Sequence, residues 1–446
     1  MSAAESIQSI ASALLAQKSL SLVSWQPIQT LWAGYGQICR VIASPDLASK
    51  SILDSSPICI APPASVFDSS STSGVTSIAS SEKSTPLESD NSTPLEFQSW
   101  ILKYIAPPST KRSGDEGHVR KILSYHIEQY FYTYLANQMP ADIPVATCLA
   151  SIKSDSTSSA NSNVSSGNPN VTAMLLTDLR AGFPVAGEKR SELNEIQVHA
   201  ALNWLAKFHG FWWARVEKFD REDLARPPLD EVKRGKEGSI DGVWLNGGYT
   251  YLATRRSEYA FLMEEEDSEW SQALCLATDG EKLSLAERVA VALAPRVDGQ
   301  GSLSNYVTLI HGDVKSENLF TTRSGDQVAF YDFQYVGLGL GVCDLAKLFT
   351  CSVPLRMLGD SAIPDKLPMQ NGEKVLLERY QKQIEASSGK KYPWDVLVKH
   401  WESALVDWLR FQASWGFWGN TEWLEARVSY ILSDAEWSAW LDRAIE

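Results

Sequence analysis

Two short stretches of this sequence point most directly to its fold: LIHGDVKSENLFTT at residues 309–322 and YDFQ at residues 331–334. The first places Asp313 and Asn318 in a polar loop between two apolar runs. The letters SGD, before the run that leads into YDFQ, indicate a hairpin turn. Such a hairpin would bring Asp332 back to the loop, so three oxygen-bearing side chains are expected to converge at one end of it.

Oxygen ligands of this kind suit Mg²⁺, which binds one or two such groups together with waters and the phosphates of a substrate. Aspartate and asparagine are also common in solvated turns, but their spacing from the second aspartate favours a site. The motif HGDVKSENLF followed by YDFQ resembles the catalytic and metal-binding loops of the aminoglycoside phosphotransferase and choline kinase-like superfamily. The continuation GVCDLAKLF, residues 341–349, is most similar to its ecdysteroid kinase-like branch.

The resemblance implies a protein kinase-like fold and a role for each motif residue. By that resemblance Asp313 is the catalytic aspartate that accepts or orients the proton of the acceptor hydroxyl, and Asn318 and Asp332 bind Mg²⁺. His311 and Asp344 would support the loop.

The resemblance also places ATP-binding residues earlier in the chain. Lys103, in the apolar run WILKYIAPP, would contact the nucleotide phosphates, and Glu128, in SYHIEQYFY, would be its ion-pair partner. Both could instead be ordinary surface charges. Asp178, in LLTDL, would belong to the hinge that binds adenine through main-chain groups, and Gly34 and Gly36, in AGYGQICR, would form the glycine loop.

Lys315 raises the alternative of a protein kinase, in which a lysine at this place contacts the transferred phosphate. Two features favour a small-molecule kinase instead. Gly312 stands where protein kinases have the arginine that reads activation-loop phosphorylation, and Asp344 follows only twelve residues after Asp332. This interval leaves no room for an activation segment that would bind a peptide.

The pattern outside the motifs predicts an α+β protein with two lobes: a small β-rich N-lobe with one main helix and a larger, mainly helical C-lobe. The apolar runs of β type lie at 27–43, 97–108, 143–150 and 171–179. One amphipathic helix is expected over 114–138, and further helices over 191–216, near 255–295 and in a Trp-rich C-terminal block.

We expect the N-lobe to comprise residues 1–180 and to bind the nucleotide. The C-lobe, residues 181–446, would hold the catalytic loop, the metal site and the acceptor pocket. Two segments rich in Ser and Thr, about 65–93 and 151–170, are expected to be disordered insertions because they contain few large apolar side chains.

Tryptophans recur every seven residues near the C-terminus, which favours an apolar seam on one face of a long helix over a wall facing a ligand. The members of this stripe are Trp394, Trp401, Trp408 and Trp415. Trp418 and Trp423 fall where that helix is expected to end, so we expect them in the acceptor pocket, where aromatic rings could stack on a substrate or hold a cation.

Composition excludes several other functions. The net charge of -14 and a pI near 5.0, without a Lys/Arg cluster, argue against nucleic acid. No stretch approaches the roughly 20 apolar residues of a membrane span. The six cysteines form no CxxC pair, so we expect reduced thiols and a cytoplasmic protein. The helical spacing of Ile7, Ile10, Leu14 and Leu15 does not form a secretory leader.

The function predicted from these features is the transfer of the γ-phosphoryl group of Mg·ATP to a hydroxyl of a small molecule whose identity the sequence leaves open. The alternatives are a pseudokinase that binds ligands without turnover and, less favoured, a protein kinase.

Overall fold

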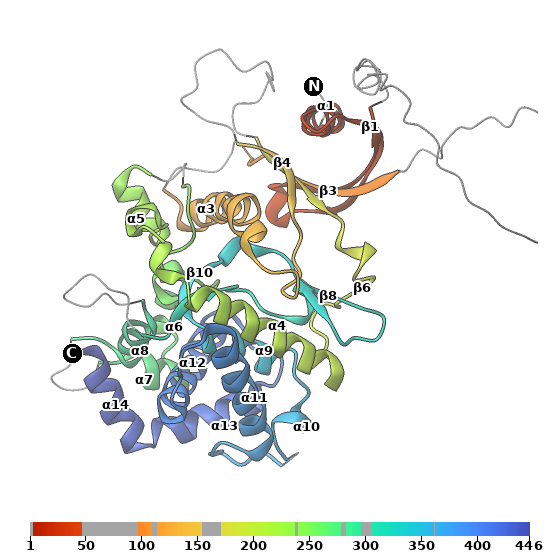
Figure 1. Cartoon of the computed structure of the whole chain (residues 1–446). Coiled ribbons are helices and arrows are strands. Elements are labelled where there is room, and N and C mark those ends of the chain that lie inside the picture. The colour runs from red at the N-terminus through yellow and green to blue at the C-terminus, as the bar shows by residue number, and fades with distance from the viewer. Residues whose placement is uncertain are drawn as a thin grey trace, which may run out of the picture.

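The computed structural model describes residues 3–46, 97–108, 114–153, 171–236, 240–277, 282–295, 305–360 and 362–446. The insertion predicted at 65–93 lies outside these ranges, and so do residues 154–170 of the second insertion. Ser151 and Ile152, which were also predicted to be disordered, instead complete a strand. The chain forms two lobes, with a sheet in the upper lobe of Figure 1 and helices in the lower one.

The N-lobe is built on a five-stranded sheet with the order β1-β2-β3-β5-β4, in which all neighbours are antiparallel. Its strands are β1 (Leu20–Thr30), β2 (Gly36–Pro45), β3 (Gln98–Ile105), β4 (Cys148–Ile152) and β5 (Thr172–Thr177). The main helix α3 (Glu116–Tyr130) separates β3 from β4, in the predicted chain order. Two boundaries differ most from the prediction: β1 begins seven residues before Pro27, and β4 begins only at Cys148.

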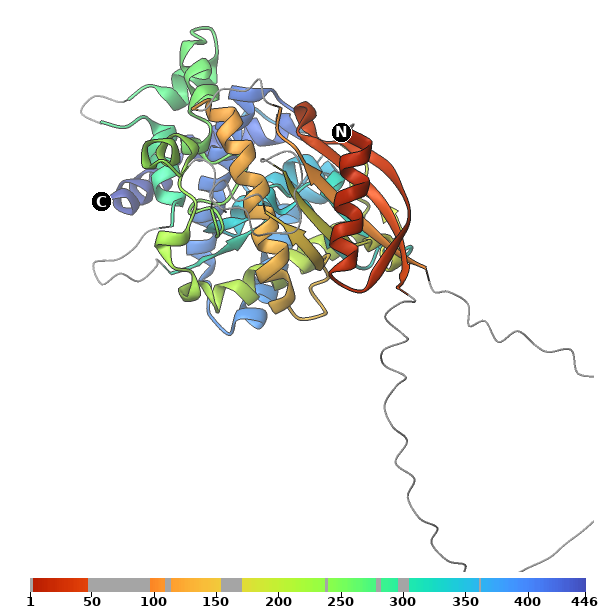
Figure 2. The same cartoon turned by 90° about the horizontal axis from the view of Figure 1, so that it is seen from above.

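Helix α1 (Ala3–Ala16) covers one face of this sheet, and α3 lies at the other (Figure 2). The apolar residues predicted for α1 are buried against alternate residues of the strands, among them Leu102 and Leu175. Successive side chains of a strand point to opposite faces. Because Leu102 and Tyr104 pack toward α1, Lys103 between them must point toward α3.

Helix α3 begins at a capping residue, Asp115, whose side chain accepts a hydrogen bond from the backbone N–H of His118 at 2.6 Å. It continues through one π-helical turn, Phe131–Leu135, and a short 3₁₀ turn, Ala136–Gln138, so the predicted helical range was nearly right. The ring of Phe131 in the π-helical turn stacks on Phe333, with centroids 3.8 Å apart. The end of α3 is therefore fixed to the loop that carries Asp332.

The C-lobe is mainly helical, as predicted. Its helices are α4 (Glu195–Trp213), α5 (Pro228–Arg234), α6 (Arg256–Glu264), α7 (Glu269–Cys275), α8 (Leu285–Leu293), α9 (Val342–Cys351), α10 (Leu355–Leu358), α11 (Asn371–Ser388), α12 (Trp394–Trp415), α13 (Thr421–Leu432) and α14 (Ala435–Ile445). Within the described ranges, no helix is both long and apolar enough to cross a membrane.

Two small antiparallel sheets in the C-lobe carry the candidate site. Strand β8 (Leu319–Thr321) pairs with β9 (Val328–Phe330), which is the predicted hairpin, and also with the short β6 (Val185–Ala186). Strand β7 (Val307–Ile310) pairs with β10 (Gly337–Leu340). The loop from β7 to β8 and the end of β9 lie beside each other, because the backbone N–H of Tyr331 donates to the carbonyl of Asn318 at 3.0 Å.

The tryptophan stripe is buried only in part. Trp401 and Trp408 are 0% and 3% exposed, as expected for a seam, whereas Trp415 is 50% exposed because α12 ends there. From this division of elements we propose that the N-lobe comprises residues 1–180 and the C-lobe residues 181–446.

Candidate active site

The loop that carries Asp313 is held by the buried carboxylate of Asp344, in the first turn of α9. One carboxylate oxygen accepts a hydrogen bond from the backbone N–H of Gly312 at 2.8 Å, and the other from that of His311 at 2.7 Å. The second oxygen also lies 3.0 Å from Nε2 of His209, whose Nδ1 is 2.9 Å from the Tyr380 hydroxyl. This network sets the backbone just before Asp313.

The backbone at Gly312 requires glycine. Its φ is +81°, a left-handed conformation, and a Cβ there would come within 2.2 Å of the carbonyl oxygen of Tyr335. An arginine at this position, as protein kinases have it, could not be accommodated without moving the loop.

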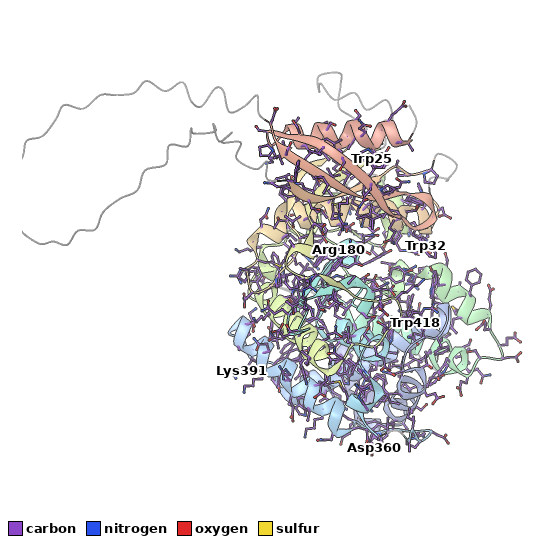
Figure 3. The ribbon with its side chains drawn as sticks, turned by 90° about the vertical axis from the view of Figure 1, so that its right-hand side faces the viewer. Trp25, Trp32, Arg180, Asp360, Lys391 and Trp418 are labelled. Carbon is purple, nitrogen blue, oxygen red and sulfur yellow. The ribbon has the colours of Figure 1, made fainter. Side chains whose placement is uncertain are left out.

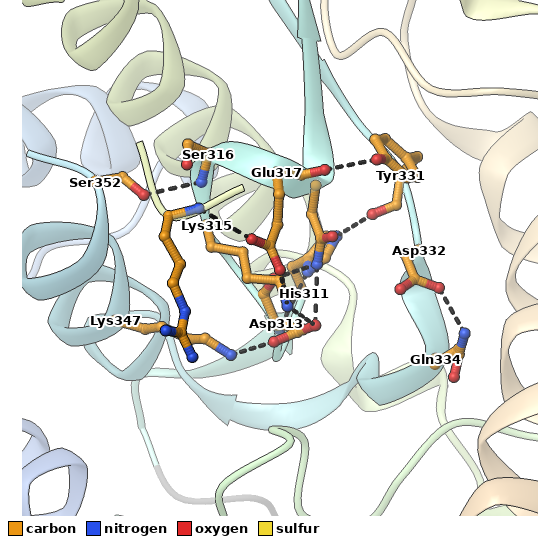
Figure 4. A network of polar contacts seen from close by, with 12 residues as sticks. His311, Asp313, Lys315, Ser316, Glu317, Tyr331, Asp332, Gln334, Lys347 and Ser352 are labelled. Carbon is orange, nitrogen blue, oxygen red and sulfur yellow. Dashed lines mark hydrogen bonds and ion pairs between the residues drawn. The ribbon is translucent and has the colours of Figure 1, made fainter. Parts of the chain in front are cut away.

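Asp313 lies in a nearly closed environment with three polar neighbours (Figure 4). The side-chain nitrogen of Asn318 donates to its carboxylate at 2.9 Å, and Nζ of Lys315 is 3.3 Å from the same oxygen. Lys347 on α9 donates to the other oxygen. Burial favours the neutral acid, but Lys347 and Lys315 outweigh it and hold the pKa of Asp313 well below its usual range. Asp313 is therefore a carboxylate at neutral pH, suited to orient a hydroxyl.

Asp332, the other predicted metal ligand, has a left-handed backbone conformation, with φ +68° and ψ +58°. Its Oδ1 accepts hydrogen bonds from Nζ of Lys103 at 3.1 Å and from Nε2 of Gln334 at 2.6 Å. The Oε1 of Gln334 accepts in turn from Ser124 on α3, at 3.2 Å. A non-glycine residue in this region is strained, and such strain persists where surrounding contacts fix it.

The donor set fits Mg²⁺ that is partly bound by a nucleotide. The hydrogen bonds of Asn318 use its amide nitrogen, which leaves the amide oxygen for a metal, and the side chain of Asp332 is 29% exposed. Among the residues that the structure describes, no three His, Cys, Asp or Glu side chains form a complete metal cage. Mg²⁺ with phosphate and water ligands does not require one.

Lys103 and Glu128 form the predicted ion pair, with Nζ 2.5 Å from the carboxylate, and both are buried. Burial alone would lower the pKa of Lys103, but the charges of Asp332 and Glu128 outweigh it and raise this pKa. The ammonium therefore stays charged beside Asp332.

Glu128 is one of four buried polar residues that recur every four positions on one side of α3. Glu116 accepts hydrogen bonds from the backbone N–H groups of Arg256 and Ser257, both at 3.1 Å, and so caps α6. Arg120 donates to the carbonyl of Thr254 at 2.6 Å and to Glu258, and Ser124 contacts Gln334. These contacts tie α3, and therefore Glu128, to α6 and to the loop that carries Asp332.

The other residues predicted to bind the nucleotide, Asp178, Gly34 and Gly36, lie in the N-lobe at the ends of its strands. Asp178 follows β5 and accepts hydrogen bonds from Arg40 at 3.1 Å and Ser99 at 2.9 Å, so it anchors the segment after β5 to the sheet. Gly34 lies in the turn between β1 and β2, Gly36 is the first residue of β2, and both have positive φ. A Cβ at Gly36 would approach the carbonyl oxygen of Tyr104 to 2.0 Å. The turn is therefore close to β3, which carries Lys103.

The two tryptophans predicted for the acceptor pocket differ in position. Trp418 is partly buried and meets Trp408 and Phe411 edge-on, with ring centroids 5.4 and 6.1 Å apart. Figure 3 shows it on the C-lobe, with Trp32 of the N-lobe on the same side. Trp423 is only 1% exposed because it is packed into the core from α13. We therefore remove Trp423 from the candidate acceptor residues.

Sequence reasoning missed three members of the site. Lys347 is a single lysine in the apolar run VCDLAKLF, three residues after Asp344, and helical spacing could have placed both on one face. Gln334 was visible as the last letter of YDFQ, but its contact with Asp332 was not. Ser124 carried no sequence signal.

The chain has two lobes, a carboxylate beside an asparagine in one loop, an aspartate in the next loop and a buried Lys–Glu pair. Together these are the parts of a kinase-like phosphotransferase. The model of the ecdysteroid kinase-like family matches residues 97–362, and the chain belongs to this family. The fold is protein kinase-like.

Solved structures of low identity align with much of the chain. A choline kinase from Cryptosporidium parvum Iowa II is 10% identical, with 99% of this chain and 95% of that chain covered and a TM-score of 0.39. A Plasmodium vivax ethanolamine kinase is 10% identical, with 95% and 84% covered and a TM-score of 0.35. A macrolide 2'-phosphotransferase type I is 13% identical, with 98% and 96% covered and a TM-score of 0.34. No curated protein has significant sequence similarity to the chain.

Proposed function

We propose that this protein transfers the γ-phosphoryl group of Mg·ATP to a hydroxyl of a small-molecule acceptor. The observation that carries the proposal is the cluster around two adjacent loops. Asp313 and Asn318 share one loop and Asp332 lies in the next, where Lys103 contacts it at 3.1 Å. This arrangement unites a hydroxyl-orienting carboxylate, two metal ligands and a phosphate-binding cation.

The protein's own groups have separable tasks in this reaction. The carboxylate of Asp313 would accept the hydrogen of the acceptor hydroxyl and so point the hydroxyl oxygen at the phosphorus. Asn318 and Asp332 would hold Mg²⁺, which supplies charge neutralisation for the phosphates when bound. Lys103 and Lys315 would balance the negative charge on the transferred group.

The geometry supports a small acceptor over a peptide. Strand β10 pairs with β7 and leads directly into α9 at Val342. The chain from Asp332 to Asp344 therefore forms a buried strand and the start of a helix, and it contains no segment that could bind a peptide. Gly312 has no space for the arginine that would read a phosphorylated activation loop. Protein kinase activity is therefore the less supported reaction.

Two measurements test the proposal and its alternative, the pseudokinase. The melting temperature should rise with Mg·ATP, by mass action, and the rise should shrink when EDTA removes the metal. Release of ADP should then occur with at least one member of a panel of hydroxyl compounds that includes amino alcohols, sterols, sugars and aminoglycosides.

The variant Asp313→Asn separates catalysis from binding. It keeps a side chain of nearly the same size, so the Mg·ATP-dependent rise in melting temperature should persist while turnover is lost. A rise without turnover in the unmodified protein would support the pseudokinase, and no rise at millimolar nucleotide would exclude both. Full turnover by Asp313→Asn would show that the catalytic role lies elsewhere.

A further inference from the structure

Lys347 contacts Asp313 from the side opposite to Asp332, one of the residues proposed to bind Mg·ATP. In Figure 4 it reaches Asp313 from α9, whereas Asp332 lies on the other side of Asp313. Only 5% of Lys347 is exposed. With Asn318 on one carboxylate oxygen and Lys347 on the other, both oxygens of Asp313 are held in place.

Aromatic rings surround the ammonium of Lys347 on this side of Asp313. Its Nζ lies 5.3 Å from the ring centroid of Tyr249 and 5.5 Å from that of Trp408. Tyr249 is itself tied to the catalytic loop, because its backbone N–H donates to the carbonyl of Gly312 at 2.8 Å. Trp408 contacts Trp418, the remaining aromatic candidate for the acceptor pocket.

A second buried cation occupies the same aromatic cluster. The guanidinium carbon of Arg255 lies 3.6 Å from the centroid of Tyr249 and 5.6 Å from the centroids of Phe411 and Trp415. Aromatic faces of this kind bind quaternary ammonium groups when they are free. Here the protein's own cations already lie over them.

We propose that Lys347 is a positioning residue for Asp313 and that, by lying over the rings of Tyr249 and Trp408, it selects acceptors without a positive charge near the reacting hydroxyl. This proposal rests on the proposed function and deepens it. A cationic acceptor would meet a buried ammonium of like charge and would find the aromatic faces occupied. A neutral acceptor meets neither obstacle.

A pair of alcohols of nearly equal shape tests this selection. Choline carries a quaternary nitrogen, and 3,3-dimethylbutan-1-ol has carbon in its place. With saturating Mg·ATP, ADP release should give a kcat/KM at least about tenfold higher for the neutral alcohol. In Lys347→Met that preference should fall about tenfold or reverse, chiefly through KM for choline. Lys347→Arg should keep the preference, because it keeps the charge.

The control is Lys391→Met, the same chemical change at a lysine whose side chain is 86% exposed (Figure 3). It should leave the preference unchanged. Melting temperatures of all variants would show whether each is folded. If Lys347→Met is not, Lys347→Gln, which also removes the charge, provides the test.

If neither alcohol is phosphorylated, the two are compared by the rise in melting temperature that each gives to the protein with Mg·ADP. Equal effects of the two alcohols on the unmodified protein, a preference for choline, or a preference that persists in Lys347→Met would overturn the proposal. Each of these results is compatible with intact Mg·ATP binding and with loss of activity in Asp313→Asn. Failure of the charge rule is therefore distinguishable from failure of the proposed function.

Discussion

Asp344→Asn provides a sharp test of how the catalytic loop is held. The carboxylate of Asp344 accepts hydrogen bonds from two main-chain donors, Gly312 N–H at 2.8 Å and His311 N–H at 2.7 Å, and it also contacts His209. An asparagine has nearly the same shape but only one acceptor oxygen. In either orientation of the amide, one of the two main-chain N–H groups faces an NH₂ group and loses its acceptor.

The expected destabilisation follows from this count. A buried donor left unpaired costs about 1–3 kcal/mol, and bonds to a charged acceptor are about 1 kcal/mol stronger than neutral ones. One lost bond and the weakening of those that remain together give about 3 kcal/mol. A shift of about 1 Å at Asp313, which directly follows Gly312, would lower kcat about 100-fold. The KM for ATP should stay within about threefold, because Lys103 and Glu128 are not touched.

The assay combines melting temperature with steady-state ADP release, using the best acceptor found in the panel. We expect a melting temperature lower by several degrees and a selective loss of kcat. The matched control is Asp360→Asn, the same change at an exposed carboxylate on the C-lobe surface (Figure 3). If Asp344→Asn melts and turns over as the control does, the hydrogen bonds of Asp344 do not hold the loop.

Three further perturbations address other parts of the molecule. Lys103→Met should weaken Mg·ATP binding roughly 10- to 150-fold, because it removes a bond to a charged group. A nucleotide titration monitored by melting temperature measures the affinity, and an unchanged affinity would contradict this expectation. Glu116→Gln should lower the melting temperature, because the Glu116 carboxylate caps α6 at Ser257. It should also reduce the rise in melting temperature with Mg·ATP, because α3, which carries Glu116, also carries Glu128, the partner of Lys103. Identical melting curves would argue against this coupling. Burial lowers the pKa of His400 from 6.5 to about 4, so the unfolded chain binds the proton more tightly and stability falls as pH drops through that window. The loss is at most about 3 kcal/mol, and His400→Gln should flatten the melting temperature between pH 7 and 4.5, whereas an unchanged slope would exclude His400 as a cause.

Local sequence was sufficient for the elements and the motif loops. The alternation of apolar residues in β3 and the amphipathic spacing of α1 and α3 depend only on neighbours within a few positions, and each element formed near its predicted place. The spacing of Asp313, Asn318 and Asp332 likewise needs only a loop and a hairpin, so their approach was predictable. Boundaries such as the start of β4 at Cys148 were less so, because they depend on pairing with β5.

Tertiary packing determined which of the remaining side chains contact the candidate active site. Lys347 and Trp423 both lie in helices of the C-lobe, yet one reaches Asp313 and the other is enclosed in the core. Their directions are set by how α9 and α13 pack against α12, which local periodicity does not encode. The sequence alone determined that Asp313, Asn318 and Asp332 would lie in two neighbouring loops. Only the folded chain determined that a buried ammonium and two aromatic rings would lie beside the carboxylate of Asp313, because these groups come from three segments far apart in sequence.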